Sequence, residues 1–174
     1  GVDDIHISKC RFSNTDRGLR VKTRRGRGKD SILKGIVFED LELEGVKAPF
    51  VVNSFYFCDP DGRTEYVGTK EALPVDDRTP KIESLEFRNI VCRNAHYCGA
   101  YIYGLPEQKI ERLVFDNVSI TYAKDTQTGV AAMMTGCEPA SKLGLVIGNV
   151  KNLILKNLSV EGQEGERLCL SGVE

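Results

Sequence analysis

The stretch VDDIHISKCRF, residues 2–12, has apolar side chains at positions 1, 4, 6, 9 and 11 of an eleven-residue pattern. The same pattern returns in residues 33–43, 82–92, 110–120 and 150–160. The copies start 31, 49, 28 and 40 residues apart, so the pattern tolerates insertions. A repeated template of this kind is typical of a solenoid, because one unit cannot bury its own apolar side chains and must stack on a neighbour.

The eighth position of the pattern lies between two alternating segments, where the chain needs a turn. It holds Asp40, Asn89, Asn117 and Asn157 in the last four copies and Lys9 in the first. Asn and Asp suit such a position because they tolerate left-handed backbone and cap local backbone groups. Another short apolar segment follows each copy: GLRVK, PFVVN, AYIYG, VAAMM and RLCLS. Each unit therefore offers about three short strands.

Many short strands can build either a parallel β-solenoid or an antiparallel sandwich. A sandwich gives no reason for one template to return five times, so the solenoid is favoured. The sequence predicts an all-β fold in which residues 1–174 form about five coils of a single domain, with residues 58–80 as an insertion.

Composition limits the possible classes of protein. With 41% hydrophobic and 28% charged residues and a net charge of -1, the 174-residue chain is typical of a globular protein. No apolar run approaches the roughly 20 residues that cross a bilayer, so no membrane partner is expected. Cys10, Cys92 and Cys169 lie in apolar stretches without a CxxC pair, which favours buried free thiols over disulfides or zinc. No metal or cofactor is expected, and such cysteines favour the cytoplasm, with secretion left open.

Residues 16–30, DRGLRVKTRRGRGKD, contain seven Arg or Lys residues. The alternation of a strand sends Leu19 and Val21 into the core and projects Arg20 and Lys22 outward, about 7 Å apart at roughly 3.3 Å per residue. Two cations at this spacing suit an extended ligand that carries carboxylates, since Arg can hold a carboxylate with two hydrogen bonds.

The rest of the basic run contains glycines and is expected on a loop at the edge of the coil; its cations are Arg24, Arg25, Arg27 and Lys29. A run of this kind is often a solvated face or a nucleic-acid patch. No nucleic-acid-binding motif or overall basic excess accompanies it, so no nucleic-acid partner is expected.

The segment GLRVKT, residues 18–23, resembles the region around the Arg-Ile-Lys motif of glycoside hydrolase family 28, the polygalacturonases and related pectinases, with Val21 in place of Ile. The resemblance continues through APFVVNSFYFCDPDG, YIYGLPEQKIERLVFDNVSI and EGQEGERLCLSG, and it is greatest to the bacterial exo-type members. It implies a right-handed parallel β-helix, of which this chain would hold only the C-terminal coils. The missing N-terminal coils of the same β-helix would be its partner.

The resemblance implies hydrolysis of α-1,4-galacturonide bonds in pectin or oligogalacturonides with inversion, by one acidic aspartate and a pair that activates water. The family supplies these groups from Asn-x-Asp, Asp-Asp and Gly-His-Gly motifs that precede its basic motif. Three stretches of this chain contain the same residue types but do not stand where the family has its motifs, or do not follow the family's order: Asn14-Thr15-Asp16, Asp3-Asp4 and Asp76-Asp77. No catalytic residue is therefore expected in this chain, and the isolated chain is expected to be inactive.

The resemblance assigns substrate binding to Arg20 and Lys22, which would hold a carboxylate of an acidic polysaccharide or oligosaccharide such as galacturonan. Family members also place an aromatic residue, usually Tyr, about one coil later, which implies Tyr56. Two alternatives remain open at this point: a solenoid that binds acidic polysaccharide without cleaving it, and a basic-loop nucleic-acid binder.

Overall fold

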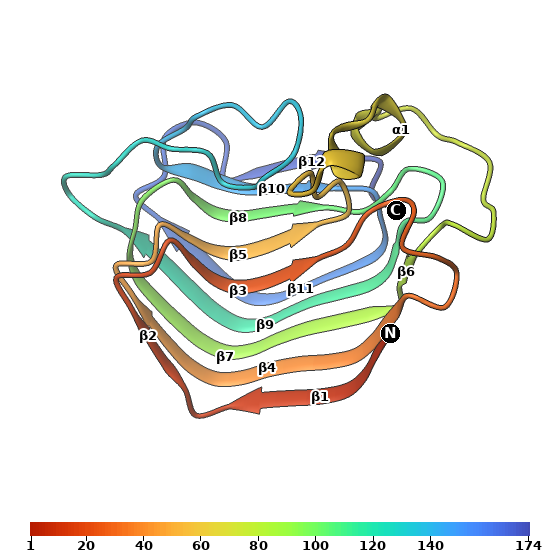
Figure 1. Ribbon diagram of the computed structural model, residues 1–174. Helices are drawn as coiled ribbons and strands as arrows, with labels where there is room; N and C mark the ends of the chain where they lie inside the picture. The colour runs from red at the N-terminus through yellow and green to blue at the C-terminus, as the bar shows by residue number, and fades with distance from the viewer.

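The computed structural model describes all residues from 1 to 174, and two parallel sheets dominate it (Figure 1). Sheet A contains, in spatial order, β1 (Val2–Ser8), β4 (Ile32–Glu44), β7 (Ser84–Ala95), β9 (Ile110–Tyr122) and β11 (Val150–Glu161), with β2 (Arg11–Ser13) and β6 (Lys81–Ile82) beside β4. Sheet B contains β3 (Arg17–Lys22), β5 (Ala48–Asn53), β8 (Cys98–Tyr103), β10 (Leu143–Gly148) and β12 (Leu168–Ser171).

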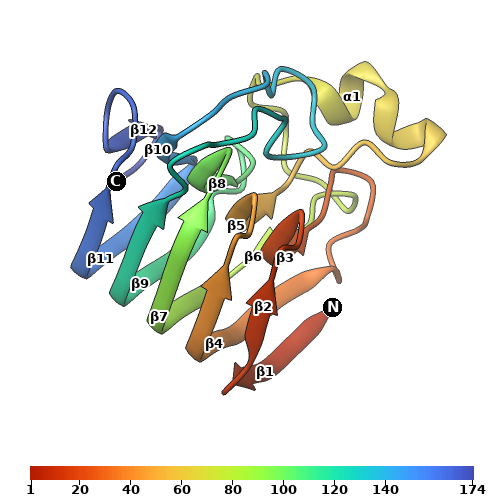
Figure 2. The same cartoon turned by 90° about the vertical axis from the view of Figure 1, so that its left-hand side faces the viewer.

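Each coil of the chain contributes to both sheets, and each strand pairs with its equivalent in the next coil. Figure 2 shows the coils stacked in chain order, with the N-terminus and the C-terminus at opposite ends of the stack. All pairings between named strands are parallel, which excludes the antiparallel sandwich. The prediction of an all-β parallel β-helix is confirmed.

The eleven-residue pattern forms sheet A, and its copies pair position by position. At the sixth position of the pattern, Phe38 pairs with Phe87, Phe87 with Phe115, and Phe115 with Leu155. The rings of Phe38 and Phe87 stack with centroids 5.5 Å apart, and Phe87 and Phe115 lie 4.9 Å apart. Phe50 of sheet B meets both Phe87 and Phe115 edge-on. This aromatic column joins the two sheets across the core.

At the eighth position of the pattern, a left-handed residue bends the chain in every coil of sheet A. The φ angles are 55° at Lys9, 54° at Asp40, 51° at Asn89, 56° at Asn117 and 48° at Asn157, which confirms the predicted conformation. The side chains bond to the next coil: Asn89 donates to Asp40 at 3.2 Å, Asn117 to Asn89 at 3.0 Å, and Asn157 to Asn117 at 2.7 Å. We refer to these four side-chain-bonded residues as the turn ladder.

The prediction of a strand at VAAMM, residues 130–134, is wrong. The fourth coil uses β10 as its strand in sheet B, and residues 130–134 lie in the loop that connects β9 to β10. Ala131, Ala132 and Met134 are nevertheless buried, because they pack on the outer face of sheet B against Val51 and Phe55. A five-residue apolar segment can form a strand or can pack as a loop on the face of a sheet, and its sequence pattern does not distinguish the two.

The cysteine prediction is correct for only part of the set. All six cysteines are free, and Cys92 is buried in the core, where burial raises the pKa of its thiol to about 12. Cys10 and Cys169, also expected to be buried, are exposed because they belong to the first and last coils, which have a neighbour on one side only.

Between β5 and β6 the chain leaves the solenoid. This segment contains two short helices, η1 (Pro60–Arg63) and α1 (Glu65–Gly68), and lies beside the outer face of sheet B (Figure 1). Neither the length nor the apolar character of any helix in the chain would allow it to cross a membrane.

Candidate functional site

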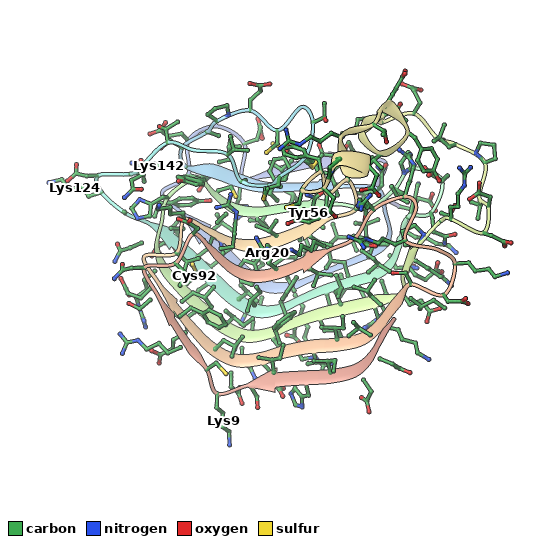
Figure 3. The ribbon with its side chains drawn as sticks, in the orientation of Figure 1. Lys9, Arg20, Tyr56, Cys92, Lys124 and Lys142 are labelled. Atoms are coloured by element: carbon green, nitrogen blue, oxygen red, sulfur yellow. The ribbon has the colours of Figure 1, made fainter.

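Strand β3 presents two of the predicted site residues on the outer face of sheet B. Leu19 and Val21 are buried, with 2% and 7% of their surface exposed, whereas Arg20 and Lys22 are exposed. Figure 3 shows Arg20 on β3 and Tyr56 near the end of β5. The alternation of the strand therefore places the cations as the sequence predicts.

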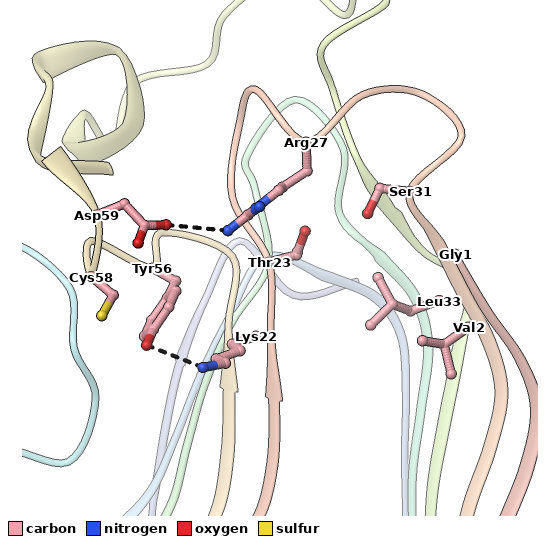
Figure 4. Close-up of a pocket in the computed structure, with 10 residues that line it drawn as sticks. All are labelled: Gly1, Val2, Lys22, Thr23, Arg27, Ser31, Leu33, Tyr56, Cys58 and Asp59. Carbon is pink, nitrogen blue, oxygen red and sulfur yellow. Dashed lines mark hydrogen bonds and ion pairs between the residues drawn. The ribbon is translucent and has the colours of Figure 1, made fainter. Parts of the chain in front are cut away.

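Tyr56 lies directly against Lys22. The Lys22 ammonium donates a hydrogen bond of 3.1 Å to the Tyr56 hydroxyl and lies 4.2 Å from the centroid of its ring (Figure 4). Buried Asn53 shapes this turn: its side-chain oxygen accepts the N–H of Phe55 at 2.8 Å. The backbone N–H of Tyr56 donates to the carbonyl of Thr23 at 3.2 Å, which ties the turn to β3.

A cavity of about 500 Å³ opens beside this pair (Figure 4). Lys22, Thr23, Tyr56 and Arg27 give it one polar side, and Val2 and Leu33 give it an apolar one. Arg20 does not line this cavity. It lines a much smaller pocket that shares Lys22 and Tyr56 with the cavity, so the structure brings the three predicted residues together in one surface region.

The cations of residues 16–30 fall into two groups by their partners. Four of them pair with carboxylates: Arg24 with Asp59 and Asp61, Arg25 with Glu107, Arg27 with Asp59, and Lys29 with Asp77. The other three form no ion pair; Arg17 donates to backbone carbonyls and Lys22 to Tyr56. The outer face of β3 therefore presents Arg17, Arg20 and Lys22 without a carboxylate from the chain itself.

Arg24 and Arg25 lie on the loop after β3, as predicted. The reading of this basic run as a solvated face is wrong for these two residues. Arg24 is 4% exposed and Arg25 1% exposed. The Arg25 guanidinium makes two bonds to Glu107, of 2.6 and 2.9 Å, and also donates to the carbonyls of Tyr66, Thr69 and Glu71. These contacts attach the segment between β5 and β6 to the solenoid, and this burial depends on that segment folding over the loop.

Sequence reasoning also missed the carboxylates that receive these arginines. The segment CDPDG, residues 58–62, carries Asp59 and Asp61 one coil after the basic run. Arg24 donates to Asp61 at 2.8 Å and to Asp59 at 3.1 Å. The hydrogen bond from Arg24 is the chief cause of the lowered pKa of Asp61. The opposite charges of the basic run and of the segment CDPDG were the feature of the sequence that could have predicted this pairing.

The acidic motifs excluded as catalytic from the sequence are ion-paired on the surface. Asp3 pairs with Lys34 at 3.0 Å, and Asp77 pairs with Lys29. A hydrogen bond from Lys47 holds the pKa of Asp16 below its ordinary value. A hydrogen bond from Arg78 does the same for the pKa of Asp76. A general acid requires a raised pKa, so these two carboxyls are unsuited to protonating a leaving group.

The two histidines also take part in local contacts. His6 lies 2.9 Å from the carboxylate of Glu39 in the neighbouring coil, and His96 accepts the backbone N–H of Gln127 through its Nδ1. Burial, followed by the charge of Lys47, lowers the pKa of His96. No group of three or more His, Cys, Asp or Glu side chains could hold a metal ion.

The arrangement on β3 and β5 can bind an anion but offers no acid–base pair. Asp59 is the one carboxylate that lines the cavity beside Lys22, and Arg24 and Arg27 already neutralise it. The site therefore combines free cations, a tyrosine ring and a polar wall. These are the features expected of a surface that holds an acidic, hydroxyl-rich ligand.

The chain is similar in sequence to two exopolygalacturonases. The chain is 28% identical to exopolygalacturonase rpg15 of Rhizopus delemar over 144 residues, which cover 81% of this chain and 35% of that protein. It is 34% identical to exopolygalacturonase clone GBGA483 of Arabidopsis thaliana over 55 residues, covering 32% of the chain and 12% of that protein. The chain thus spans about a third or less of the length of these relatives, and no solved structure matches it significantly.

The match to a protein family is more extensive. The sequence model of glycosyl hydrolases family 28 matches residues 1–138, which include β3, the turn at Tyr56 and the buried arginines. The repeated pattern, the parallel coils and the unpaired cations on β3 are consistent with this match, and the chain belongs to glycosyl hydrolases family 28.

Proposed function

We propose that this chain is the C-terminal, substrate-binding portion of a polygalacturonase-type glycoside hydrolase. The complete enzyme would hydrolyse α-1,4-galacturonide bonds with inversion. Membership of family 28 and the similarity to two exopolygalacturonases support this proposal. The substrate is an acidic polysaccharide or oligosaccharide of galacturonate.

The observation that carries the proposal is the partition of charge in residues 16–30. Four cations are paired with carboxylates of the chain, and Arg20 and Lys22 are left exposed and unpaired beside Tyr56. The backbone of β3 is already fixed by its hydrogen bonds to β5, so ligand binding costs little further backbone entropy. The unpaired positive charges favour a ligand with carboxylates over a neutral sugar.

Each binding residue would have a distinct role. Arg20 offers a planar fork that can hold a uronate carboxylate with two hydrogen bonds, and Lys22 adds a compact charge. Tyr56 would contact the face of a sugar ring and can also hydrogen-bond a hydroxyl. The aspartates that protonate the leaving oxygen and activate water would come from coils of the same β-helix outside this chain.

We predict that Arg20→Ala or Lys22→Ala in the intact protein lowers kcat/KM on polygalacturonate by roughly tenfold to a hundredfold. The loss of one charge-assisted hydrogen bond costs roughly 1.5–3 kcal/mol. Because both side chains point outward, the melting temperature should stay within a few degrees of the wild-type value. Release of reducing ends and thermal melts measure the two effects.

Lys156→Ala is the matched control for this pair. Lys156 is an exposed strand lysine on sheet A, with only a long contact of 3.8 Å to Asp116, and its loss should leave kcat/KM unchanged. Full activity of both β3 variants would show that the pair does not bind substrate. A large drop in melting temperature would instead assign it to folding.

A second prediction separates cleavage from binding. The 174-residue chain alone should release no reducing ends from polygalacturonate above background, because its carboxylates near the site are neutralised by arginine. Reducing-end release by the purified chain would contradict the assignment of catalysis to other coils. If the intact protein also binds but does not cleave, the alternative of a non-catalytic solenoid for acidic polysaccharide is the correct one.

A further inference from the structure

A second cavity lies on the outer side of sheet B, in later coils than the cavity beside Lys22. Its volume is about 470 Å³, and it lies between α1 and the loop of residues 123–142. Figure 1 shows both segments on this side of the molecule, beyond β8, β10 and β12. The lining residues come from five segments of the chain: Gly68, Lys70, Tyr101, Tyr103, Met134, Thr135, Gly136, Asn149 and Ser171.

Lys70 supplies the one positive charge of this lining. It is exposed, forms no ion pair, and makes one hydrogen bond, to the carbonyl of Gly68 at 3.0 Å. Its ammonium lies 3.9 Å from the centroid of the Phe55 ring. Partial burial of the ammonium over the Phe55 ring, followed by the charge of the nearby Arg25, lowers the pKa of Lys70 to about 8. Lys70 is therefore a cation without a counter-charge at the edge of a cavity.

The remaining lining is aromatic and polar without further charge. The rings of Tyr101 and Tyr103 are 5.4 Å apart, and the absence of a side chain at Gly148 lets the Tyr103 ring lie across β10. The hydroxyls of Tyr103, Thr135 and Ser171 are not engaged in side-chain hydrogen bonds of the chain. A single cation, an aromatic wall and free hydroxyls match a sugar that carries one carboxylate better than they match a phosphate, which prefers several cations or backbone N–H groups.

We propose that this cavity is a second binding site for an acidic sugar residue, in which Lys70 holds the carboxylate and Tyr103 contacts the sugar. The choice of an acidic sugar rests on the proposed function above, whereas the site itself rests on the lining. The site lies on the same face of the β-helix as Lys22 and uses no residue of the first site. The protein would thus hold its polymer at two places.

Surface plasmon resonance on the immobilised intact protein tests this proposal, with trigalacturonate in continuous flow so that cleavage does not deplete the ligand. In the Lys22→Ala background, residual binding of trigalacturonate is expected. Adding Lys70→Met should weaken that residual binding by about tenfold or more, and adding Tyr103→Phe by about twofold to tenfold. Neutral galactotriose should not bind at this site.

Lys124→Met is the matched control, because Lys124 is also exposed and lies at the outer tip of the 123–142 loop (Figure 3). It should leave binding unchanged. The proposal is overturned if no residual binding remains in Lys22→Ala, if Lys70→Met changes it less than twofold, or if galactotriose binds equally well. If Lys22→Ala keeps full turnover while Lys70→Met still removes one binding event, the first site is wrong and the second stands.

Discussion

Replacing Arg25 by methionine is expected to lower the free energy of unfolding by about 3–5 kcal/mol. The change would leave the Glu107 carboxylate, whose side chain is 4% exposed, buried without its partner. It would also remove the donors to the carbonyls of Tyr66, Thr69 and Glu71, which fix the α1 segment. Chemical denaturation followed by circular dichroism measures the loss, and limited proteolysis should show earlier cleavage between residues 57 and 80.

Arg27→Met is the control in the same loop. Arg27 is half-exposed and reaches Asp59 at 3.4 Å, so its removal should cost less than about 1 kcal/mol. The double variant Arg25→Met with Glu107→Leu should lose less than the sum of the single changes, because it leaves no buried charge unpaired. Equal stability of the Arg25 and Arg27 variants would mean that the buried pair does not attach the segment.

Replacing Phe87 by alanine is expected to cost about 3–5 kcal/mol, since it opens a cavity in the centre of the aromatic column. Phe87 is fully buried, with Phe38 and Phe115 above and below it and Phe50 at its edge. The coils on either side lose a shared contact, so the whole stack should melt earlier. Thermal melts and denaturant titration of the intact protein provide the measurement.

Leu155→Ala separates the effect of position in the pattern from the effect of burial. Leu155 occupies the same sixth position in the last coil but is 37% exposed, so its truncation should cost about 1 kcal/mol. Losses of similar size in the two variants would show that the column does not form one continuous core.

The repeated pattern allowed most of the fold to be predicted because its copies must pair in register to bury the same positions. The apolar residues of the pattern became sheet A, and the turn residues took the left-handed backbone. The strand of the fourth coil was missed, since both VAAMM and Leu143–Gly148 are apolar and follow the same copy. Only the pairing of β10 with β8 decides between them.

For the candidate site, the positions on strands were predictable and those in loops were not. The two-residue period of β3 placed Arg20 and Lys22 outward and Leu19 inward, and Tyr56 emerged from the resemblance to the family. The burial of Arg25 depends on Glu107 from two coils later and on three carbonyls of the α1 segment. Contacts between segments so far apart leave no local pattern in the sequence.

The turn ladder gives this solenoid a modular construction. The segments between successive ladder residues differ widely in length, yet each returns to the same hydrogen-bonded column in the sheet-A strand of the next coil. Loops can therefore be lengthened or exchanged without shifting the stack, and the α1 segment is such an addition. Evolution can change the loops around the binding face in this way while the stacked sheets stay constant. Because the ladder residues are equivalent from coil to coil, they are suitable crossover points for chimeras that exchange coils between relatives.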